Sequence, residues 1–206
     1  MAGDFEIVLA TTNRGKLTEL QVLLKGRGVK VEGLEGFGRV EAPVEDGATL
    51  AENARLKARH YSQELHRVVL ADDSGLEVEA LSGQPGVHSA RYSGGEWTDR
   101  TEQDRANIKK LLEVMSEIPR EKRQARFCCC LCLVSESKIL LAVEGYLEGY
   151  IAHQPRGNNG FGYDPVFLLP DRDKTVAELS PEEKNAISHR GQALRKLMAR
   201  WEEIDF

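Results

Sequence analysis

The sequence predicts an α/β protein with a mixed β-sheet flanked by helices. Short apolar runs that are typical of buried strands alternate with longer segments whose apolar residues recur at helical spacing. Glycine, proline and capping residues separate these segments. Strands and helices in this mixed order indicate a sheet covered by helices.

The composition is that of an ordinary globular protein. The 206 residues are enough for one domain with a substantial core, and 41% of them are apolar and 30% charged. The sequence contains no internal repeat, low-complexity tract or clear linker. We therefore expect a single domain over residues 1–206.

Charge and hydropathy limit the partners that we expect. The net charge of −5 argues against a general affinity for polyanions, so no nucleic-acid partner is expected. No apolar run approaches the roughly 20 residues that span a bilayer, and residues 1–6 do not resemble a signal peptide. We expect a cytoplasmic protein without a membrane partner.

The chain should open with a strand, a helix and a second strand. The strand is predicted over Ile7–Ala10, and the second over Val29–Val31. Between them lies a helix with Leu17, Leu20 and Leu24 on one face.

A capping box, Thr49 with Glu52, predicts the start of the next helix. Its apolar stripe consists of Leu50, Ala54, Ala58, Tyr61 and Leu65. A short buried strand is then predicted over Val68–Ala71, ending at Asp72-Asp73, with a further strand over Leu76–Leu81. Residues 83–95 are expected to form a loop, because glycine and proline interrupt them.

The second half of the chain begins with a helix predicted over Thr98–Met115, which Pro119 would stop. A hairpin is expected from Ala125–Val134 and Ile139–Val143, and Tyr146–Ile151 would continue the sheet.

A glycine-rich loop, a short strand and two helix signals complete the chain. The strand is predicted over Val166–Leu169. Ser180-Pro181 is typical of a helix start, and the closing helix carries Leu194, Leu197 and Met198.

All four cysteines lie between Cys128 and Cys132, within the apolar run Phe127–Val134. Cys129 and Cys132 form a C-x-x-C pattern, but residues three apart on a strand point to opposite faces. They cannot share one tetrahedral metal ion, so buried structural thiols are favoured over a zinc or redox site.

The segment Thr11-Thr12-Asn13-Arg14-Gly15-Lys16 lies between a predicted strand and helix. A helix N-terminus offers free N–H groups and suits phosphate. The segment is not a P-loop, because Ala10 and Leu17 stand where that motif needs glycine and serine or threonine. The alternative is an asparagine-capped helix with a solvated lysine.

Acidic residues form a second candidate site. Asp72-Asp73 follows a predicted buried strand, where a carboxylate can hold Mg²⁺ or accept a proton from water. The alternative is a turn closed by an aspartate side chain. Glu45 suits a metal ion and Lys57 a phosphate chain, and Asn53 shares a helix face with Lys57.

Two further segments carry polar and aromatic side chains. In residues 157–165, Phe161 or Tyr163 would stack on a base and Asp164 would accept a hydrogen bond from it; the alternative is a packed hairpin loop. Residues 184–190 concentrate Lys184, His189 and Arg190, and the alternative there is a solvated helix start.

Together these segments resemble the inosine triphosphate pyrophosphatase family, the house-cleaning dITP/XTP pyrophosphatases. The resemblance runs from about Ile7 to Met198 and rests on motifs that occur in the same order: Leu9–Lys16, Glu45-Asp46-Gly47 with Glu52-Asn53-Ala54, Ala71–Leu76, Pro85–Tyr92, Gly160–Pro165 and Ser188–Gly191.

The resemblance implies an elongated α/β fold with two lobes and a substrate cleft between them, and a homodimer. It implies Mg²⁺-dependent hydrolysis of ITP, dITP and XTP between the α and β phosphates, giving a monophosphate and pyrophosphate. It assigns the general base and a metal ligand to Asp73, and a second metal ligand to Glu45. The triphosphate would be held by Thr11, Thr12, Asn13, Arg14, Gly15, Lys16 and Lys57. The nucleoside would be held by Ser74, Phe161, Gly162, Tyr163, Asp164, Lys184, His189 and Arg190.

A hypothesis for selectivity follows from the bases. Hypoxanthine and xanthine carry a 6-keto acceptor, whereas adenine carries a 6-amino donor. Donors from His189 or Arg190 would pair with the 6-keto group and be left unpaired against the 6-amino group.

Three alternative functions are less favoured. One is a related pyrophosphatase for modified pyrimidine or methylated nucleotides, and another is a nucleotide-binding module without hydrolysis. A phosphotransferase is disfavoured because the P-loop pattern fails.

Overall fold

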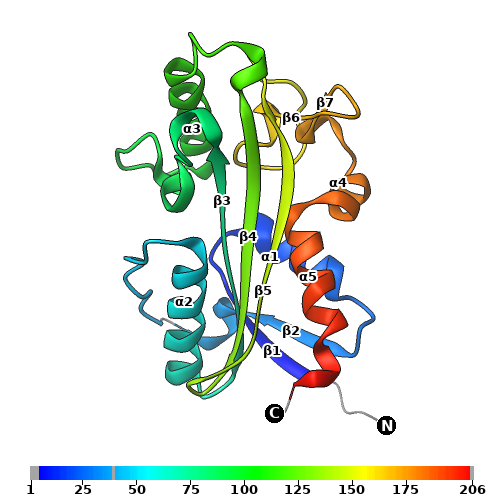
Figure 1. Ribbon diagram of the computed structural model, residues 1–206. Coiled ribbons are helices and arrows are strands. Elements are labelled where there is room, and N and C mark those ends of the chain that lie inside the picture. Colours follow the sequence, from blue (N-terminus) through cyan, green and yellow to red (C-terminus); the bar gives the residue numbers. More distant parts are fainter. Residues whose placement is uncertain (1–4, 39, 205–206) are drawn as a thin grey trace. The chain divides into compact units, whose positions relative to one another are not determined.

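The protein contains a seven-stranded sheet with the strand order β2-β1-β3-β4-β5-β6-β7 (Figure 1). It is seen here in a computed structural model that describes residues 5–38 and 40–204. The strands are β1 Phe5–Ala10, β2 Val29–Gly33, β3 Val68–Val78, β4 Gln124–Ser135, β5 Lys138–Ile151, β6 Phe167–Leu169 and β7 Lys174–Thr175.

The sheet is mixed, as the sequence predicts. β1 pairs in parallel with both β2 and β3, whereas β6 pairs antiparallel with both β5 and β7. β4 and β5 are neighbours joined by a short turn at Glu136, which has a left-handed φ of 54°. The predicted hairpin about residues 135–138 is therefore confirmed.

The chain divides into two compact units, and each is described by itself. Unit 1 consists of the described parts of Met1–Asp73, Cys129–Gly145 and His189–Phe206, and unit 2 of Ser74–Cys128 and Tyr146–Ser188. The chain passes from one unit to the other within β3, β4 and β5 and between the last two α-helices. The expectations of a single domain and of a cleft between two lobes stay predictions.

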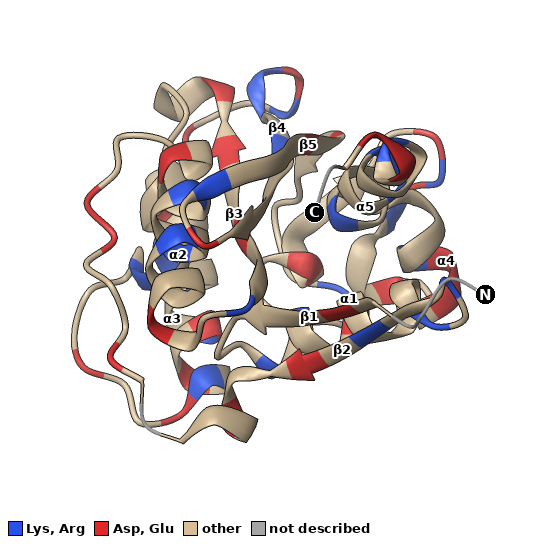
Figure 2. Cartoon of the chain, turned by 90° about the horizontal axis from the view of Figure 1, so that it is seen from below, with Lys and Arg blue, Asp and Glu red and all other residues tan. Residues whose placement is uncertain are grey.

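In unit 1, helices cover both faces of the strands. These helices are α1 Arg14–Leu24, α2 Leu50–Leu65 and α5 His189–Ala199. Figures 1 and 2 show α2 on one face and α1 and α5 on the other. On the α1–α5 face, Leu20, Leu24 and Leu194 share a buried cluster with Ile7 and Leu9 of β1.

Strand geometry assigns the remaining residues of β1 to the other face. Neighbouring residues of a strand point to opposite sides. Val8 and Ala10 therefore point toward α2, whose buried stripe includes Leu50, Ala54, Ala58 and Tyr61 as predicted.

Unit 2 has its own core. Its helices are α3 Arg100–Val114 and α4 Pro181–Ile187, together with short 3₁₀ helices, among them η3 Gly86–Arg91 in the predicted loop. Ile108, Leu111 and Met115 from the α3 region pack with Phe127 and Phe167, whose stacked rings have centroids 4.2 Å apart.

The structure confirms the predicted positions of the helices and the capping box at Thr49. The capping box predicted at Thr49 is present. Another capping box, at Ser180, begins α4, and Pro181 is the first residue of that helix. The helix predicted over Thr98–Met115 is α3, which begins two residues later because the Asp99 side chain caps it.

All four cysteines are buried thiols outside any disulfide, as predicted. Cys129 belongs to the cluster on the α1–α5 face. Burial raises the pKa of Cys132 to about 11, against the opposing effect of Arg55 and Arg59 on α2. A thiol with this pKa is almost fully protonated at neutral pH and is a poor nucleophile.

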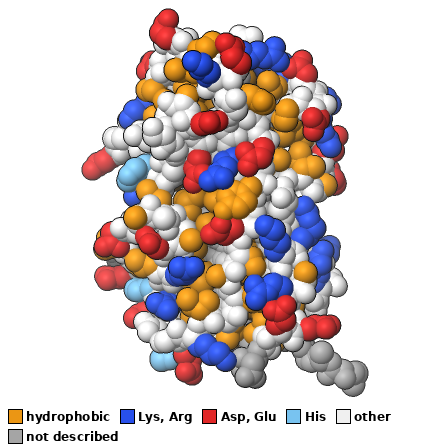
Figure 3. Space-filling view, in the orientation of Figure 1, with side chains coloured by type: hydrophobic (Ala, Val, Ile, Leu, Met, Phe, Trp, Pro, Cys, Tyr) orange, Lys and Arg blue, Asp and Glu red, His pale blue; other side chains and the backbone are white. Residues whose placement is uncertain are grey.

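The surface carries charges of both signs. Lys and Arg side chains are interspersed with Asp and Glu on the face that Figure 3 shows. None of the helices in the described residues is long and apolar enough to cross a membrane.

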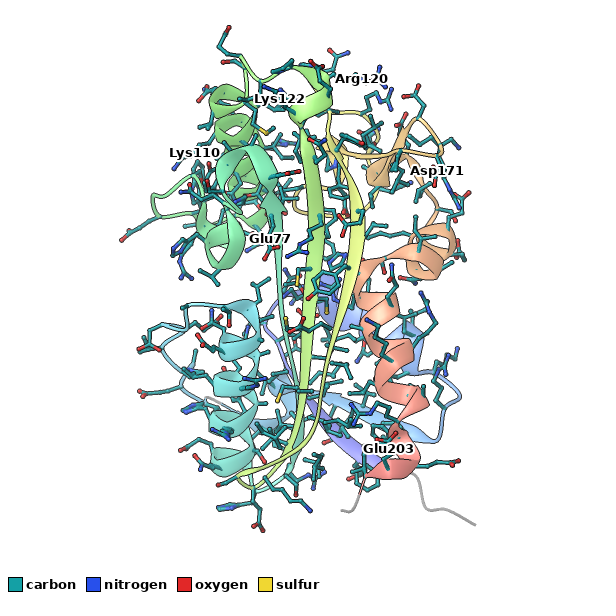
Figure 4. All side chains as sticks on the ribbon, viewed as in Figure 1. Glu77, Lys110, Arg120, Lys122, Asp171 and Glu203 are labelled. Carbon is teal, nitrogen blue, oxygen red and sulfur yellow. The ribbon has the colours of Figure 1, made fainter. Side chains whose placement is uncertain are left out.

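One strand prediction was wrong. Two strands were predicted, Val68–Ala71 and Leu76–Leu81, but β3 runs without interruption from Val68 to Val78 and a 3₁₀ helix follows at Glu79–Leu81. Glu77, labelled on β3 in Figure 4, accepts a hydrogen bond at 2.7 Å from Arg126 Nε of β4. Polar side chains in this stretch have partners outside the strand, so they do not end it as they would in an isolated segment.

Candidate active site

The segment Thr11–Lys16 joins β1 to α1 in unit 1. The Asn13 side chain caps α1, with its Oδ1 accepting from Lys16 N at 3.2 Å, and Thr11 Oγ1 accepts from Asn13 N at 3.2 Å. The predicted asparagine cap is therefore confirmed. The lysine of the alternative interpretation is not solvated, because the Lys16 side chain is 14% exposed and forms an ion pair with Asp72.

Asp72 lies in a buried group of charges on the α1–α5 face. Its side chain is fully buried and pairs with Lys16 of α1 and, at 2.8 Å, with Arg190 Nε of α5. The Cys129 thiol donates to Asp72 Oδ2 at 3.2 Å. Arg190 also pairs with Glu19. Burial opposes the charge of Arg190, but Asp72 and Glu19 outweigh it and raise the pKa of the guanidinium.

Asp73 belongs to a different group of charges, on the α2 face. Its Oδ1 lies 2.6 Å from Lys57 Nζ, and Glu45 Oε2 lies 3.2 Å from the same ammonium. Burial raises the pKa of the Asp73 carboxyl, although Lys57 and Lys16 act in the opposite direction. Burial opposes the charge of Lys57, but Asp73 and Glu45 raise its pKa.

The two neighbouring carboxylates point in opposite directions because they lie in the middle of β3 and not in a turn. Asp72 follows Leu70 on the face of α1 and α5, and Asp73 follows Val69 and Ala71 on the face of α2. The sequence predicted a carboxylate pair, and the structure gives each carboxylate its own partners.

The turn that carries Glu45 is fixed by α2. Asn53 Oδ1 accepts from Gly47 N at 2.8 Å. A Cβ at Gly47 would lie 2.6 Å from that oxygen, so the contact requires glycine. The Asn53 side chain thus holds the turn two residues after Glu45, beside Lys57 on the next turn of the helix.

Glu45 and Asp73 are the residues of this group that suit a divalent cation. Their oxygens converge on one ammonium group, so the position already favours positive charge. The described residues contain no group of three or more His, Cys, Asp or Glu side chains that could hold a metal ion. Mg²⁺ is usually bound by one or two carboxylates together with substrate phosphates and water, so the pair fits such an ion.

Unit 2 holds the glycine-rich loop of residues 157–165. Gly160 and Gly162 adopt left-handed φ angles of 78° and 62° on either side of Phe161. Asp164 Oδ2 accepts from Phe161 N at 2.9 Å, and a Cβ at Gly160 would lie 2.0 Å from that oxygen. The loop can close on the Asp164 carboxylate only with glycine at position 160.

Lys184 of α4 completes this group in unit 2. Its ammonium lies 2.6 Å from Asp164 Oδ2 and 4.4 Å from the centre of the Phe161 ring. The lysine is buried, so it is not the solvated charge of the alternative interpretation. An aromatic ring, an ammonium and a carboxylate are thus held together, which suits recognition of a planar, hydrogen-bonding group.

Tyr163 has a packing role in the structure. It is buried, its hydroxyl donates to Ser89 O at 2.9 Å, and burial raises its pKa. Of the two aromatic residues proposed for stacking, Phe161 is therefore the better placed.

The remaining predicted residues lie in both units. In unit 1, Thr12 and Arg14 are exposed, Gly15 lies in the first turn of α1, and His189 is the buried first residue of α5. Ser74 is half-buried in β3 and belongs to unit 2.

The predicted residues thus divide between the two units, and the structure brings together Glu45, Lys57 and Asp73 in unit 1 and Phe161, Asp164 and Lys184 in unit 2. The unit 1 group consists of Thr11–Lys16, Glu45, Lys57, Asp73, His189 and Arg190, and the unit 2 group of Ser74, Phe161–Asp164 and Lys184. Sequence reasoning missed Glu19, the partner of Arg190, because 171 positions separate the two residues. Only a long-range contact reveals this pair, since Glu19 alone is an ordinary helix residue.

Comparison with known proteins adds the family. The model of the Ham1 family matches residues 7–200. The chain belongs to the Ham1 family. A HAM1 protein from Coxiella burnetii has a similar structure, with a TM-score of 0.86 and 44% identity, over 97% of this chain and 99% of that one.

Curated relatives in the Ham1 family carry the name of an activity. The dITP/XTP pyrophosphatase of Geobacillus kaustophilus is 53% identical, covering 97% of this chain and 95% of its own length. The dITP/XTP pyrophosphatase of Bacillus subtilis is 46% identical, covering 93% and 94%. The family resemblance found in the sequence is confirmed.

Proposed function

We propose that this Ham1-family chain hydrolyses the non-standard purine nucleotides ITP, dITP and XTP to the monophosphate and pyrophosphate. The activity named for relatives that match nearly the whole chain supports this proposal. The observation that carries it within the chain is the buried Asp73 carboxylate in contact with Lys57, with Glu45 beside the same ammonium.

Asp73 is the proposed acceptor of the proton from the attacking water. A general base works best when its pKa approaches the working pH, and burial shifts the pKa of Asp73 in that direction. The carboxylate points to the α2 face, apart from the charges around Asp72, so transfer of a proton to it leaves that group intact.

Lys57 and the start of α1 are the proposed phosphate ligands. Lys57 holds a charge that neighbouring carboxylates stabilise, and the first turn of α1 offers backbone N–H groups. Together these donors would neutralise the charge on the departing pyrophosphate. Lys16, in the first turn of α1, adds a further cation, and its ammonium is paired with Asp72.

Glu45 and Asp73 are the proposed ligands of Mg²⁺. When bound, such an ion supplies positive charge that neutralises phosphate oxygens and polarises a water molecule. Lys57 lies between the two carboxylates and must give up part of this contact when a cation binds there.

The unit 2 group is the proposed base site. Phe161 offers a ring for stacking, Lys184 a donor and Asp164 an acceptor. A 6-keto base would accept a hydrogen bond from the lysine, whereas a 6-amino base would place its own donor against the ammonium and lose this bond, a loss of roughly 1–3 kcal/mol. Arg190 is proposed to hold Asp72 and Glu19 in position, because its guanidinium forms ion pairs with both carboxylates.

The assembly and location follow the family resemblance. We propose a cytoplasmic homodimer whose ligand is a small-molecule nucleotide and which uses neither nucleic acid nor a membrane as a partner. The oligomeric state is measured directly by light scattering of the purified chain.

The test of the proposed function is product identification. The purified chain is incubated with ITP, dITP, XTP, dATP, dGTP or dUTP, in Mg²⁺ or in EDTA, and the products are separated by ion exchange. IMP and pyrophosphate from ITP, loss of turnover in EDTA and little turnover of dATP are expected. Guanine also carries a 6-keto group, so little turnover of dGTP would require a further feature that excludes its 2-amino group. D73N should slow the reaction by roughly 10²- to 10⁴-fold, whereas D171N, at an exposed position of unit 2, should preserve it.

Other results would favour other functions. Release of inorganic phosphate would contradict attack at the α phosphorus. Preferred turnover of dUTP would favour a pyrophosphatase for modified pyrimidines. Binding of nucleotides without hydrolysis would favour the non-enzymatic module.

A further inference from the structure

The glycine-rich loop of unit 2 receives a hydrogen bond from α3 that the sequence analysis did not anticipate. Asp104 Oδ2 accepts from Gly162 N at 2.8 Å. The Asp104 residue is buried, and its other oxygen, Oδ1, lies 3.0 Å from Arg100 Nε one turn earlier in α3. The Arg100 guanidinium therefore lies beside the carboxylate that accepts this bond, and Oδ1 itself receives no hydrogen bond from the described residues.

The position of Phe161 depends on the backbone on both sides of it. The flanking residues, Gly160 and Gly162, both adopt left-handed φ angles. Glycine has more accessible conformations than any other residue, so these two positions do not fix the direction of the intervening side chain by themselves. Asp164 holds the N–H of Phe161, and Asp104 holds the N–H of Gly162.

The hydrogen bond from Gly162 N to Asp104 is important because a cavity lies beside the loop. Asp104 and Gly162 both line a cavity of about 910 Å³ between α3 and the loop. Protein atoms do not fill this space, so packing alone does not prevent the loop from moving into it. The hydrogen bond from Gly162 N to Asp104 fastens the loop to the helix at the edge of this cavity.

We propose that Asp104 is a positioning residue for the base-binding loop. By holding Gly162 it sets the direction of the Phe161 ring, and with it the ammonium of Lys184 that lies against this ring. Asp104 itself does not touch the base. This inference rests on the proposed function, because it assumes that Phe161 and Lys184 bind the base of the nucleotide.

The test compares two ligands that report on different groups of residues. IMP carries the base, whereas pyrophosphate carries only the groups that unit 1 is proposed to bind. Both are titrated by calorimetry in Mg²⁺ against the wild-type chain, D104A and D104N. Alanine removes the acceptor and is the best helix former; asparagine keeps an acceptor oxygen at nearly the same place.

The expected result is a selective loss. D104A should weaken IMP roughly tenfold, the effect of losing one charge-assisted hydrogen bond, and change pyrophosphate affinity less than about twofold. D104N should restore most of the IMP affinity. E113A is the matched control, since Glu113 lies on the same helix and lines the same cavity, and its carboxylate pairs with Lys109 at 3.8 Å. It should leave both affinities unchanged.

Three results would overturn the inference: equal weakening of IMP and pyrophosphate in D104A, no weakening of either, or a D104N chain that binds IMP no better than D104A. If D104A does not fold, D104S carries the same expectation, because its hydroxyl is too short to reach Gly162 N. A wild-type chain that binds neither ligand would instead contradict the proposed function. Unchanged IMP affinity in D104A, with ITP hydrolysis intact in the wild type, contradicts this inference alone.

Discussion

Asp72 and Asp73 are neighbours in β3, yet their carboxylates contact different cations on opposite faces of the sheet. Changing each of them to asparagine keeps the size of the side chain and removes its charge. We expect D72N to lower the stability of the fold and D73N to lower turnover.

The expected cost of D72N follows from burial. The side chains of Asp72 and Arg190 are 0% and 1% exposed, and a hydrogen bond to a buried charged group contributes roughly 1.5–3 kcal/mol. Lys16 is 14% exposed, so its pair with Asp72 is better screened and contributes less. Glu19 still pairs with Arg190 in the variant. We expect the free energy of unfolding to fall by about 3 kcal/mol, and Tm by about 6–12 °C for a chain of this size.

D73N is expected to lower turnover and to change the stability of the fold little. Burial disfavours the charged form of Asp73, so a neutral side chain relieves that cost while Glu45 remains beside Lys57. The free energy of unfolding should stay within about 1 kcal/mol of the wild-type value. Loss of a general base should lower kcat by roughly 10²- to 10⁴-fold.

Two assays on the same three proteins distinguish these effects. Urea unfolding followed by circular dichroism in EDTA measures stability without metal linkage, and pyrophosphate release from ITP measures turnover. A D72N chain as stable as the wild type would refute the structural role of Asp72. A D73N chain with wild-type kcat would remove Asp73 as the proton acceptor.

Two further predictions concern the core of unit 1. Because burial raises the pKa of Cys132 to about 11, iodoacetamide at neutral pH should leave it unmodified in the native chain and label it after unfolding; mass spectrometry of the peptides checks this, and rapid native labelling would contradict it. At Gly145, a Cβ would lie 2.1 Å from His189 O and 2.4 Å from Ala193 N. G145A should therefore lower the free energy of unfolding by about 3 kcal/mol or more in urea titrations, whereas G36A, where a Cβ meets nothing within 4 Å, should not.

Much of the fold follows from local patterns. The capping box at Thr49, the helix start at Ser180, the apolar stripe of α2 and the hairpin of β4 and β5 were all predicted from residues close together in the chain. In these segments the hydrophobic period and the end signals agree, and tertiary contacts reinforce what the local sequence already favours.

The error in β3 has a tertiary cause. Asp72, Asp73 and Gly75 are typical of a turn, and no pattern in the sequence shows that buried cations will neutralise the carboxylates. Asp72 finds Arg190 at a separation of 118 positions. Gly75 is needed because a Cβ there would lie 2.5 Å from Gly86 O, so it reflects close packing and not a bend in the strand.

The candidate site was predictable in identity more than in role. The ordered motifs located the site residues, but the residue types alone did not show which cations bind phosphate and which neutralise a buried carboxylate. Lys57 and Lys184 are each buried beside a carboxylate, and Lys16 and Arg190 both pair with Asp72. A lysine that holds a structural carboxylate and one that is available to a phosphate look the same in a sequence, because the difference lies in the partner.

The continuity of β3 explains why these two aspartates need not compete for one role. In a turn, neighbouring carboxylates would share one environment and repel each other, and either could take the proton. Within a strand, alternation sends Asp72 to the face of α1 and α5, where Arg190 and Lys16 neutralise it, and Asp73 to the face of α2. The residues that fix Asp72 also fix the register of β3, since a shift of one position would bury Asp73 against Arg190 and turn Asp72 toward Lys57. The buried ion pairs around Asp72 therefore determine which carboxylate is presented beside Glu45.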